Sequence, residues 1–500
     1  ALKEKNPLAM QAALGFRGNK SSINGMIGAG LLYSDYKGDD IPFPITRSFS
    51  QGLSPLQFLA STFGGRTGVI STKLNTAEAG ALNKQLTQSA HQVMVDRDDE
   101  EGDWHIGTSP RGLPVDTGDR ANIGTFLAHE TAGYAKNTIL TPKILRDLQE
   151  KGEDRILVRS PLVGGTAYGG VHARDLGIRN SRGIPQAGSF IGVETGQGVG
   201  EPLTQLQLSR KHGGGVSGGS SVGGFKLIEA LANPPKQMPF GAAHAQVDGR
   251  IDRIDENPAG GKDIWIGNKK HYVPSQMGLK IKPGDTVEAG DVLSEGVPNP
   301  RDVVAHKGVG EGRRYLMQTM HDAYRDSGVN SRGLRRNLEP VVRGLVDHVV
   351  MTDFWNGHVP DDVVKYSHIE NNWTPRPGYM NKNPRAAVGK YLESPVLHHT
   401  VGTQVKASMI PELERFKVNQ VMVHNDPPPF QPNLLRATEN LQHDPDWQVR
   451  LGGQYLQRGL LDSAHRGLTS STTGSSFIPA LIRGDNLDKS MSKQPNPFSK

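Results

Sequence analysis

GLSPLQFLASTFGGRTGVISTKLNTAEAGALNKQL, residues Gly52–Leu86, is the stretch that decides the fold. Apolar residues recur through it at spacings of three, four or seven, the period of a helix with one buried face. Pro55 suits a first helical turn. The pattern predicts one helix over residues 54–94, on the order of 50–60 Å long at 1.5 Å per residue. Glycines at positions 64, 65, 68 and 80 each weaken it by about 1 kcal/mol relative to alanine, so it should bend easily.

A basic stripe runs along this predicted helix. Arg66, Lys73 and Lys84 are spaced seven and eleven residues apart, so they share one helical face. On base rates such a stripe is more often a solvated face. The sharper interpretation is a row of phosphate contacts along a nucleic-acid cleft. A formal net charge of +6 favours a polyanionic partner only mildly.

A second region combines a helix, a glycine segment and another helix. Residues 198–212 and 225–232 are predicted to be short helices. Between them, Gly213–Gly224 holds seven glycines in twelve residues, and such a segment cannot hold a fixed shape alone. The arrangement is that of a lid that folds and unfolds over a site, with an ordinary surface loop as an equally weighted alternative.

The rest of the 500-residue chain has the composition of a multidomain α+β protein. Strands are predicted over 245–254, 263–273 and 281–293, and helix over 310–350. The chain has no cysteine, which excludes disulfides, a thiolate nucleophile and cysteine-ligated zinc. No apolar run reaches the roughly 18 residues of a membrane span, so no membrane partner is expected.

These segments resemble the C-terminal part of the β′ subunit of multisubunit DNA-dependent RNA polymerases. Gly52–Leu86 is similar to the bridge helix, and GSFIGVETGQGVGEPLTQLQLSRKHGGG (Gly188–Gly215) is similar to the start of the trigger loop. Further matches follow in the family's order: Ala13–Asn19 with the loop that supports the bridge helix, Gly284–Val309 and Met317–Leu334 with later barrel and helical segments, and Gly357–Ser367 and Ser463–Gly484 with the C-terminal region.

The resemblance implies an α+β multidomain fold with a long bridge helix, a helical trigger-loop hairpin, a small β-barrel or sandwich-hybrid segment and a helical C-terminal clamp region. The expected segments are a funnel or support-loop-like region 1–50, the bridge helix 51–95, a mixed jaw and clamp-connecting region without zinc 96–187, the trigger loop 188–237, a β-barrel-like segment 238–300, a helical segment 301–350, a clamp and assembly region 351–487 and a disordered tail 488–500.

The resemblance also implies roles for individual residues. Seven fall on positions that face nucleic acid, support it or flex beside the templating base: Arg17, Arg66, Lys73, Thr76, Ala77, Gly80 and Lys84. In the trigger loop, Gln205 matches a residue that contacts the nucleotide sugar, and Leu208 one that stacks on the base. His212 matches the histidine near the β-phosphate, where it would stabilise charge or donate a proton to pyrophosphate.

Two departures from the family pattern stand out. Ser209 replaces the phosphate-facing arginine of the trigger loop. Arg210 and Lys211 are tentative substitutes that point about 100° and 200° further round a helix, so they serve only if it is rotated or reshaped. Arg159–Gly177 corresponds to a segment that binds zinc through cysteines in bacterial enzymes. Glycines and other residues stand there instead, so zinc is not expected and glycine turns should replace it.

The Asn-Ala-Asp-Phe-Asp-Gly-Asp motif with which the family binds Mg²⁺ is absent, and the acidic turn Asp96–Asp103 lacks its spacing. The resemblance thus implies two-metal chemistry with Mg²⁺ held by another chain, and a chain inactive alone. Expected partners are a DNA template, an RNA transcript, nucleoside triphosphates, an N-terminal β′-like chain, β-like chains and a phage initiation factor. The cysteine-free, compact form resembles giant-phage polymerases, which implies the host cytoplasm during infection and leaves packaging in the virion open.

Three other interpretations compete. A virion or scaffold protein could keep the polymerase architecture without catalysis, and Ser209 favours that alternative. Turns at Gly284-Asp285 and Gly290-Asp291 resemble those of biotinyl or lipoyl carrier domains, but no lysine has the required setting. The run Gly196-x-Gly198-x-Gly200 invites a dinucleotide fingerprint, yet no βαβ unit follows.

Overall fold

The computed structural model describes residues 6–7, 10–11, 20–30, 32–33, 41–73, 75–95, 110–165, 169–179, 183–212, 224–235, 238, 241–258, 260–275, 277–327, 329 and 333–467. The chain forms two compact units, residues 1–443 and 444–500. Helices and small antiparallel sheets alternate along it, so the predicted α+β class is confirmed. Among the described residues no helix has the length and apolar character needed to cross a membrane.

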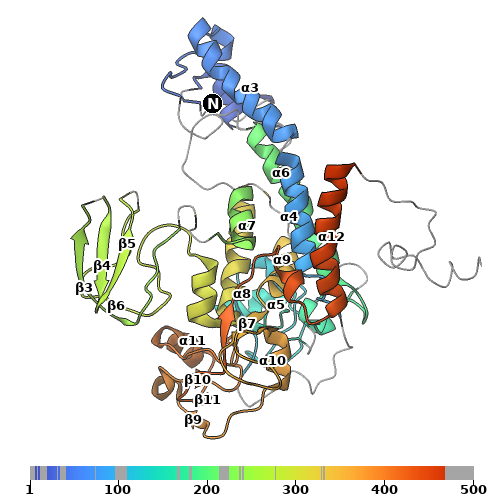
Figure 1. The fold of residues 1–500 in the computed structure, drawn as a ribbon, viewed down its shortest axis with the longest axis vertical. Helices are drawn as coiled ribbons and strands as arrows, with labels where there is room; N and C mark the ends of the chain where they lie inside the picture. Colours follow the sequence, from blue (N-terminus) through green and yellow to red (C-terminus); the bar gives the residue numbers. More distant parts are fainter. Residues whose placement is uncertain are drawn as a thin grey trace, which may run out of the picture. The chain divides into compact units, whose positions relative to one another are not determined.

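The helices of the first unit are α2 (Lys20–Ile27), α3 (Pro55–Lys73), α4 (Asn75–Ser89), α5 (Pro142–Glu150), α6 (Ile191–His212), α7 (Gly224–Ala232), α8 (Pro300–Asp326), α9 (Leu334–Leu345), α10 (Tyr366–Asn372) and α11 (Ile410–Arg415) (Figure 1). Short 3₁₀ helices are η1 (Phe49–Gln51), η2 (Arg120–Asn122), η3 (Ala173–Leu176), η4 (Pro384–Ala387), η5 (Ala407–Met409) and η6 (Asn440–His443). The second unit contains α12 (Trp447–Arg466).

The strands form four described sheets, all antiparallel. They are β1 (Leu113–Asp116) with β2 (Arg155–Val158); β5 (Lys269–Val273), β4 (Lys262–Ile266), β3 (Gly249–Glu256) and β6 (Thr286–Val287) in that order; β12 (Phe430–Asn433), β7 (His348–Met351) and β8 (Val363–Lys365); and β10 (Tyr391–Leu392), β11 (Val421–His424) and β9 (Met380–Lys382).

Helices α3 and α4 occupy most of the helix predicted over residues 54–94. Ser54 and Gln57 form a reciprocal cap at the start of α3, because each backbone N–H lies within 3.4 Å of the other's side-chain oxygen. Pro55 occupies the first turn, as predicted. The two helices are separated by Leu74, which lies outside the described residues.

Helix α6 corrects the sequence-based boundary. A short helix from Gly198 was predicted, but α6 begins at Ile191 and includes Pro202 in its interior. Glycines at positions 192 and 196 weaken the helical signal before residue 198, because glycine is a poor helix former. Packing against α4 and α9 overrides that local preference.

Two other boundaries differ from the prediction. The run 263–273 is not one strand but the hairpin of β4 and β5, which turns at Gly267, a glycine with positive φ. Lys270 lies in β5 and pairs with Asp263 at 3.3 Å. The helix predicted over 310–350 is instead the end of α8, then α9, then β7.

Helix α8 is kinked at Gly308, where φ is 86° and ψ is 170°. This conformation favours glycine, and a Cβ there would lie 2.6 Å from Thr403 Oγ1. Two residues later, a Cβ at Gly310 would meet the carbonyl oxygen of His398 at 1.9 Å. The kink therefore lets α8 approach the loop around residues 398–403 closely.

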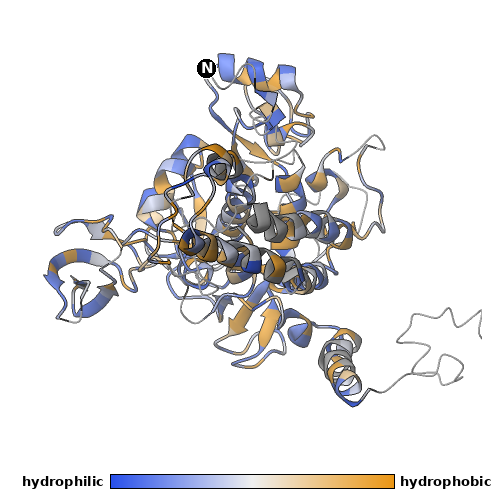
Figure 2. Cartoon of the chain, turned by 90° about the horizontal axis from the view of Figure 1, so that it is seen from above, coloured by the Kyte–Doolittle hydropathy of each residue, from blue (hydrophilic) through white to orange (hydrophobic). Residues whose placement is uncertain are grey.

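The first unit has one large apolar core and two small ones. The large core joins side chains of α4, α6, α7, α8 and α9 to those of the sheets β1–β2 and β12–β7–β8. A second core lies within the sheet of β3–β6. A third joins Ala60 of α3 to Tyr33 and Ile45, which precede that helix. Figure 2 shows apolar and polar residues alternating along the same helices, as expected for elements with one buried face.

Candidate functional site

Helices α4 and α6 lie side by side (Figure 1) and touch through glycines. Three glycines of α6, spaced four residues apart, face two residues of α4 and Ala90, the residue that follows it. A Cβ added at the glycine would lie within 2.7 Å of a partner atom in each pair: Gly192 with Ala90, Gly196 with Thr87, and Gly200 with Asn83. The contact is therefore a glycine stripe, and only residues without a side chain allow this approach.

The order of these pairs shows that α4 and α6 run antiparallel. Positions on α6 rise from 192 to 200 while their partners, at the end of α4 and just after it, fall from 90 to 83. Continued by the same helical rise, this register sets Leu208 level with residues 75–76. The last part of α6, up to His212, packs against α3. The backbone that carries the three predicted catalytic residues thus runs along the stretch predicted to flex.

Several predicted site residues lie partly or wholly beyond what the structure describes. The side chains of Thr76 and of residues 205–212 lie outside the described residues, and these positions are placed by their helices alone. Arg17, the acidic turn Asp96–Asp103, the glycine tip 213–223 and the tail 488–500 lie wholly outside them. The roles given to these residues stay predictions.

The predicted nucleic-acid contacts on α3 and α4 that are described all lie on the surface. They are Arg66, Lys73, Ala77, Gly80 and Lys84. Within the described ranges, none of the three cations makes an ion pair with another side chain. A Cβ at Gly80 would meet no atom within 4 Å, so close packing does not explain the glycine at this position.

Helix α6 is held on its other side by α9. A Cβ at Gly198 would lie 2.9 Å from Asn337 Nδ2, and Arg179 donates a hydrogen bond to Asn337 Oδ1. The Tyr324 hydroxyl of α8 donates to the carbonyl oxygen of Val199 at 2.9 Å. The first half of α6 is therefore fixed between two helices, whereas its second half continues along α3.

Residues 159–177, the segment predicted to replace a zinc site by glycine turns, are held by buried arginines. Four consecutive carbonyl oxygens each accept a hydrogen bond from a guanidinium. The donors are Arg343 to Pro161 (2.8 Å) and Gly164, Arg313 to Leu162 (3.2 Å) and Arg111 to Val163 (2.6 Å). We call these three side chains the arginine cradle.

Arg343 is buried in the arginine cradle, with 2% of its surface exposed. Its Nε also donates to the carbonyl oxygen of Gly169 at 3.3 Å. Burial, followed by the charge of Arg313, lowers the pKa of Arg343 to about 10, so it stays protonated at neutral pH. Gly165 makes room for it, since a Cβ there would lie 1.9 Å from Arg343 Nη2. The absence of zinc here stays a prediction.

Two features escaped the sequence analysis for different reasons. The glycine stripe has a visible signal, the four-residue spacing of Gly192, Gly196 and Gly200. In the sequence analysis, the glycines of this segment were compared only with a dinucleotide fingerprint. The arginine cradle has no local signal, because its donors lie about 50 to 180 residues from the carbonyls that they bind.

The sequence matches known proteins over the same region. Residues 52–257 match the family model described as RNA polymerase Rpb1, domain 5. Three relatives are DNA-directed RNA polymerase β′ subunits. The chain is 30% identical over 388 residues to that of Caldicellulosiruptor saccharolyticus (74% of this chain, 33% of the relative). It is 31% identical over 364 residues to that of Natranaerobius thermophilus (69% and 29%). It is 32% identical over 380 residues to that of Desulforudis audaxviator (71% and 32%).

The chain therefore spans about a third of the length of the curated relatives that it matches. Over that part it is β′-like, so the resemblance stated from the motifs is confirmed at this level. A phage-encoded, split form stays a prediction.

Proposed function

We propose that this β′-like chain supplies the bridge helix and the trigger loop of a DNA-directed RNA polymerase. In this proposal α3 and α4 are the bridge helix, and α6, the glycine tip 213–223 and α7 are the trigger loop. The observation that carries it is the antiparallel contact of α4 and α6 through the glycine stripe. By this register, residues 205–208 of α6 lie alongside residues 75–80 of α4. The proposed reaction needs the nucleotide-contacting residues next to the templating position.

The proposed bridge helix would bend beside the template base. Gly80 and Gly65 are exposed and face open space, so neither glycine is needed for packing. Each costs the helix about 1 kcal/mol relative to alanine. Exposed Arg66, Lys73 and Lys84 would then contact phosphates, and Thr76 and Ala77 would lie beside the templating position.

The proposed trigger loop would close over the incoming nucleotide. Gln205 would contact its sugar, Leu208 would stack on its base, and His212 would stabilise or protonate the pyrophosphate leaving group. Arg210 or Lys211 would have to contact the triphosphate in place of the arginine that Ser209 replaces. Paired Mg²⁺ ions, bound by polypeptide outside these 500 residues, would neutralise charge on the phosphates.

Exposed apolar side chains support a multichain enzyme. On α3, Leu56, Phe58, Leu59 and Val69 are each 51–64% exposed. A helix with this much apolar surface is typical of one that another chain covers. The proposed partners are an aspartate-motif β′-like chain, β-like chains, DNA, RNA and nucleoside triphosphates. The finer proposal, a phage enzyme acting in the host cytoplasm or packaged in the virion, rests on the cysteine-free composition and the short glycine tip.

The test is nucleotide addition by the complex that co-purifies with this chain. An aspartate-motif chain and β-like chains should be identified in it by mass spectrometry. In single-nucleotide addition, His212→Ala should slow the rate on the order of 10²-fold, the typical contribution of a positioned acid or base. His129→Ala, at an exposed histidine outside α3, α4 and α6, is the matched control. An unchanged rate in His212→Ala would refute its role.

One alternative function is favoured by a specific observation, the serine at position 209. Ser209 removes a cation that the family uses at the triphosphate, which favours a virion structural protein that retains the architecture without catalysis. A complex that assembles with all its partners but adds no nucleotide on a primed template would select this alternative.

A further inference from the structure

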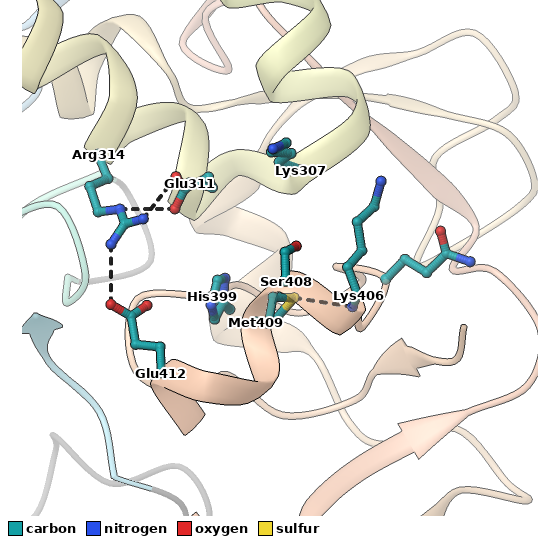
Figure 3. Close-up of a pocket in the computed structure, with 9 residues that line it drawn as sticks. Lys307, Glu311, Arg314, His399, Lys406, Ser408, Met409 and Glu412 are labelled. Atoms are coloured by element: carbon teal, nitrogen blue, oxygen red, sulfur yellow. Dashed lines mark hydrogen bonds and ion pairs between the residues drawn. The ribbon is translucent and has the colours of Figure 1, made fainter. Parts of the chain in front are cut away.

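A second candidate site lies between α8, the loop 396–406 and α11. A cavity of about 150 Å³ opens there, lined among others by Lys307, Glu311, His399, Lys406 and Glu412 (Figure 3). None of these residues belongs to α3, α4 or α6, and the proposed polymerase function uses none of them.

Two adjacent histidines, His398 and His399, carry unsatisfied ring nitrogens, and His399 lines the cavity. His399 is 6% exposed, and neither of its ring nitrogens has a hydrogen-bond partner in the part of the chain that the structure describes. The Nδ1 atom of His398 also lacks one there. Leaving buried polar atoms unpaired costs free energy, so these three nitrogens point to a ligand.

Glu311 orients His398. The Nε2 atom of His398 lies 2.8 Å from Glu311 Oε2. The carboxylate oxygen of Glu311 accepts this hydrogen bond, so Nε2 of His398 carries the proton and Nδ1 keeps the lone pair. Metal-binding histidines in proteins are typically fixed by such a carboxylate.

Glu412 completes the set. Its Oε1 atom accepts hydrogen bonds from Arg155 (3.0 Å) and Arg314 (3.3 Å). Its Oε2 atom lies 3.9 Å from His398 Nδ1. One ligand atom each of His398, His399 and Glu412 lies within 4.8 Å of the other two.

We propose that His398, His399 and Glu412 bind a zinc ion, with Glu311 as the residue that positions His398. Two imidazoles and one carboxylate are a ligand set that Zn²⁺ accepts, with bonds of about 2.0–2.2 Å. Zn²⁺ bound by three protein ligands typically keeps a fourth position for water. In a chain without cysteine, histidine and carboxylate side chains are the ligands left for such an ion.

Positive charges near the site would repel a bound cation. Four cationic side chains lie near the site, but each has an acceptor of its own. Arg155 and Arg314 bind Glu412, Lys307 lies 2.9 Å from Asp291, and Lys406 donates to the carbonyl oxygen of Ala289. The four cationic side chains therefore weaken the attraction of Glu311 and Glu412 for a bound cation but do not abolish it. An inorganic anion held by Lys307 and Lys406 is the competing occupant.

The bound ion would link the loop of His398 and His399 to Glu412 of α11, and the hydrogen bond from His398 to Glu311 would extend this link to α8 just after its kink. His398 and Glu311 are 87 residues apart in sequence, and α8 already touches the backbone of His398 at Gly310. The expected role is structural, a cross-link of the region that follows the kink.

The experiment measures zinc in the assembled, tag-free complex by mass spectrometry, in wild type and in His399→Ala. The variant complex should contain one zinc fewer per chain, which corrects for zinc bound by partner chains. After metal removal, Co²⁺ should give the visible absorption of a four-coordinate site in wild type, and these bands should be lost in His399→Ala and weakened in Glu412→Gln. His129→Ala is the matched control and should keep both signals.

Folding is checked separately, since a core histidine variant could misfold. His399→Gln keeps much of the side-chain volume, and circular dichroism shows whether the fold is retained. Equal zinc content and equal Co²⁺ spectra in folded wild type and His399→Gln would overturn the proposal. So would thermal stabilisation of wild type by inorganic phosphate and not by Zn²⁺. Neither result would bear on the polymerase proposal, because nucleotide addition is measured at another site.

Discussion

The α4–α6 pair and the arginine cradle hold the chain together in opposite ways. In the pair, the two helices approach closely because α6 has glycine at the contact positions. The exposed face of α4 carries glycine and lysine. In the cradle, buried guanidiniums bind the main chain of a loop at four consecutive carbonyls. The first contact depends on shape and the second on hydrogen bonds, so substitutions should affect them by different amounts and for different reasons.

The largest effect is expected in the arginine cradle. Arg343→Met keeps an apolar chain of similar length but leaves the carbonyls of Pro161, Gly164 and Gly169 without this donor. Unpaired buried acceptors cost about 1–3 kcal/mol each, so the free energy of unfolding should fall by about 3–5 kcal/mol. Urea-induced unfolding of the 500-residue chain measures it.

Arg385→Met is the matched control, because Arg385 pairs with Glu414 on the surface and its loss should change stability little. Equal losses in the two arginine variants would mean that the buried hydrogen bonds do not stabilise the loop.

The second effect concerns the glycine stripe. Gly192→Ala should lower the free energy of unfolding by about 1–3 kcal/mol, since overpacking forces the backbone to shift. Its Cβ would lie 1.8 Å from the carbonyl oxygen of Ala90, which cannot rotate away. Gly200→Ala should cost less, because its Cβ meets the side chain of Asn83, which can rotate. The reverse order in thermal or urea unfolding would contradict the close contact at residue 192.

A third, smaller effect of opposite sign is expected on the free face of α4. Gly80→Ala should stabilise the helix by about 1 kcal/mol, because nothing lies within 4 Å of the new Cβ. Amide hydrogen exchange over Asn75–Ser89 should slow. If bending at this position serves nucleotide addition, the rate should fall while stability rises. Faster exchange in the alanine variant would show that the glycine has a packing role.

The smallest change is expected as a pH dependence next to the cradle. Burial raises the pKa of Glu339, which accepts a hydrogen bond from Ser160 and lies near Arg335. Above pH 4.5 and up to that raised pKa, the folded chain keeps a proton that the unfolded chain has lost. Stability therefore falls as pH rises through this window.

Glu339→Gln removes this proton, so its stability relative to wild type should increase as pH rises through the same window. Glu414 is the matched control of opposite sign, because the hydrogen bond from Arg385 lowers its pKa. Wild type should lose that contribution as pH falls, and Glu414→Gln should not. Parallel unfolding curves for wild type and Glu339→Gln from pH 4 to 7 would contradict the raised pKa.

The sequence by itself determined the elements whose signals are local. The period of apolar residues from Leu56 to Val93 specified a long helical stretch, and the cap at Ser54 and Pro55 specified its start. The helix predicted over residues 225–232 also lies within one residue of α7. Helical period and capping act over a few residues, so they can be read from a single chain. The motif order likewise identified the β′-like character that the relatives confirm.

Only the tertiary structure decided the contacts between distant residues. The glycines of α6 are required by the close surfaces of α4 and α9, which no local pattern reveals. Nothing in the sequence around Arg343 shows that the carbonyl of Pro161 accepts its hydrogen bond. His398 and His399 come close to Glu412 of α11 only in the folded chain. Local propensity amounts to about 1 kcal/mol per residue, and burial in a packed core outweighs it, so these features depend on the partners that the fold brings near.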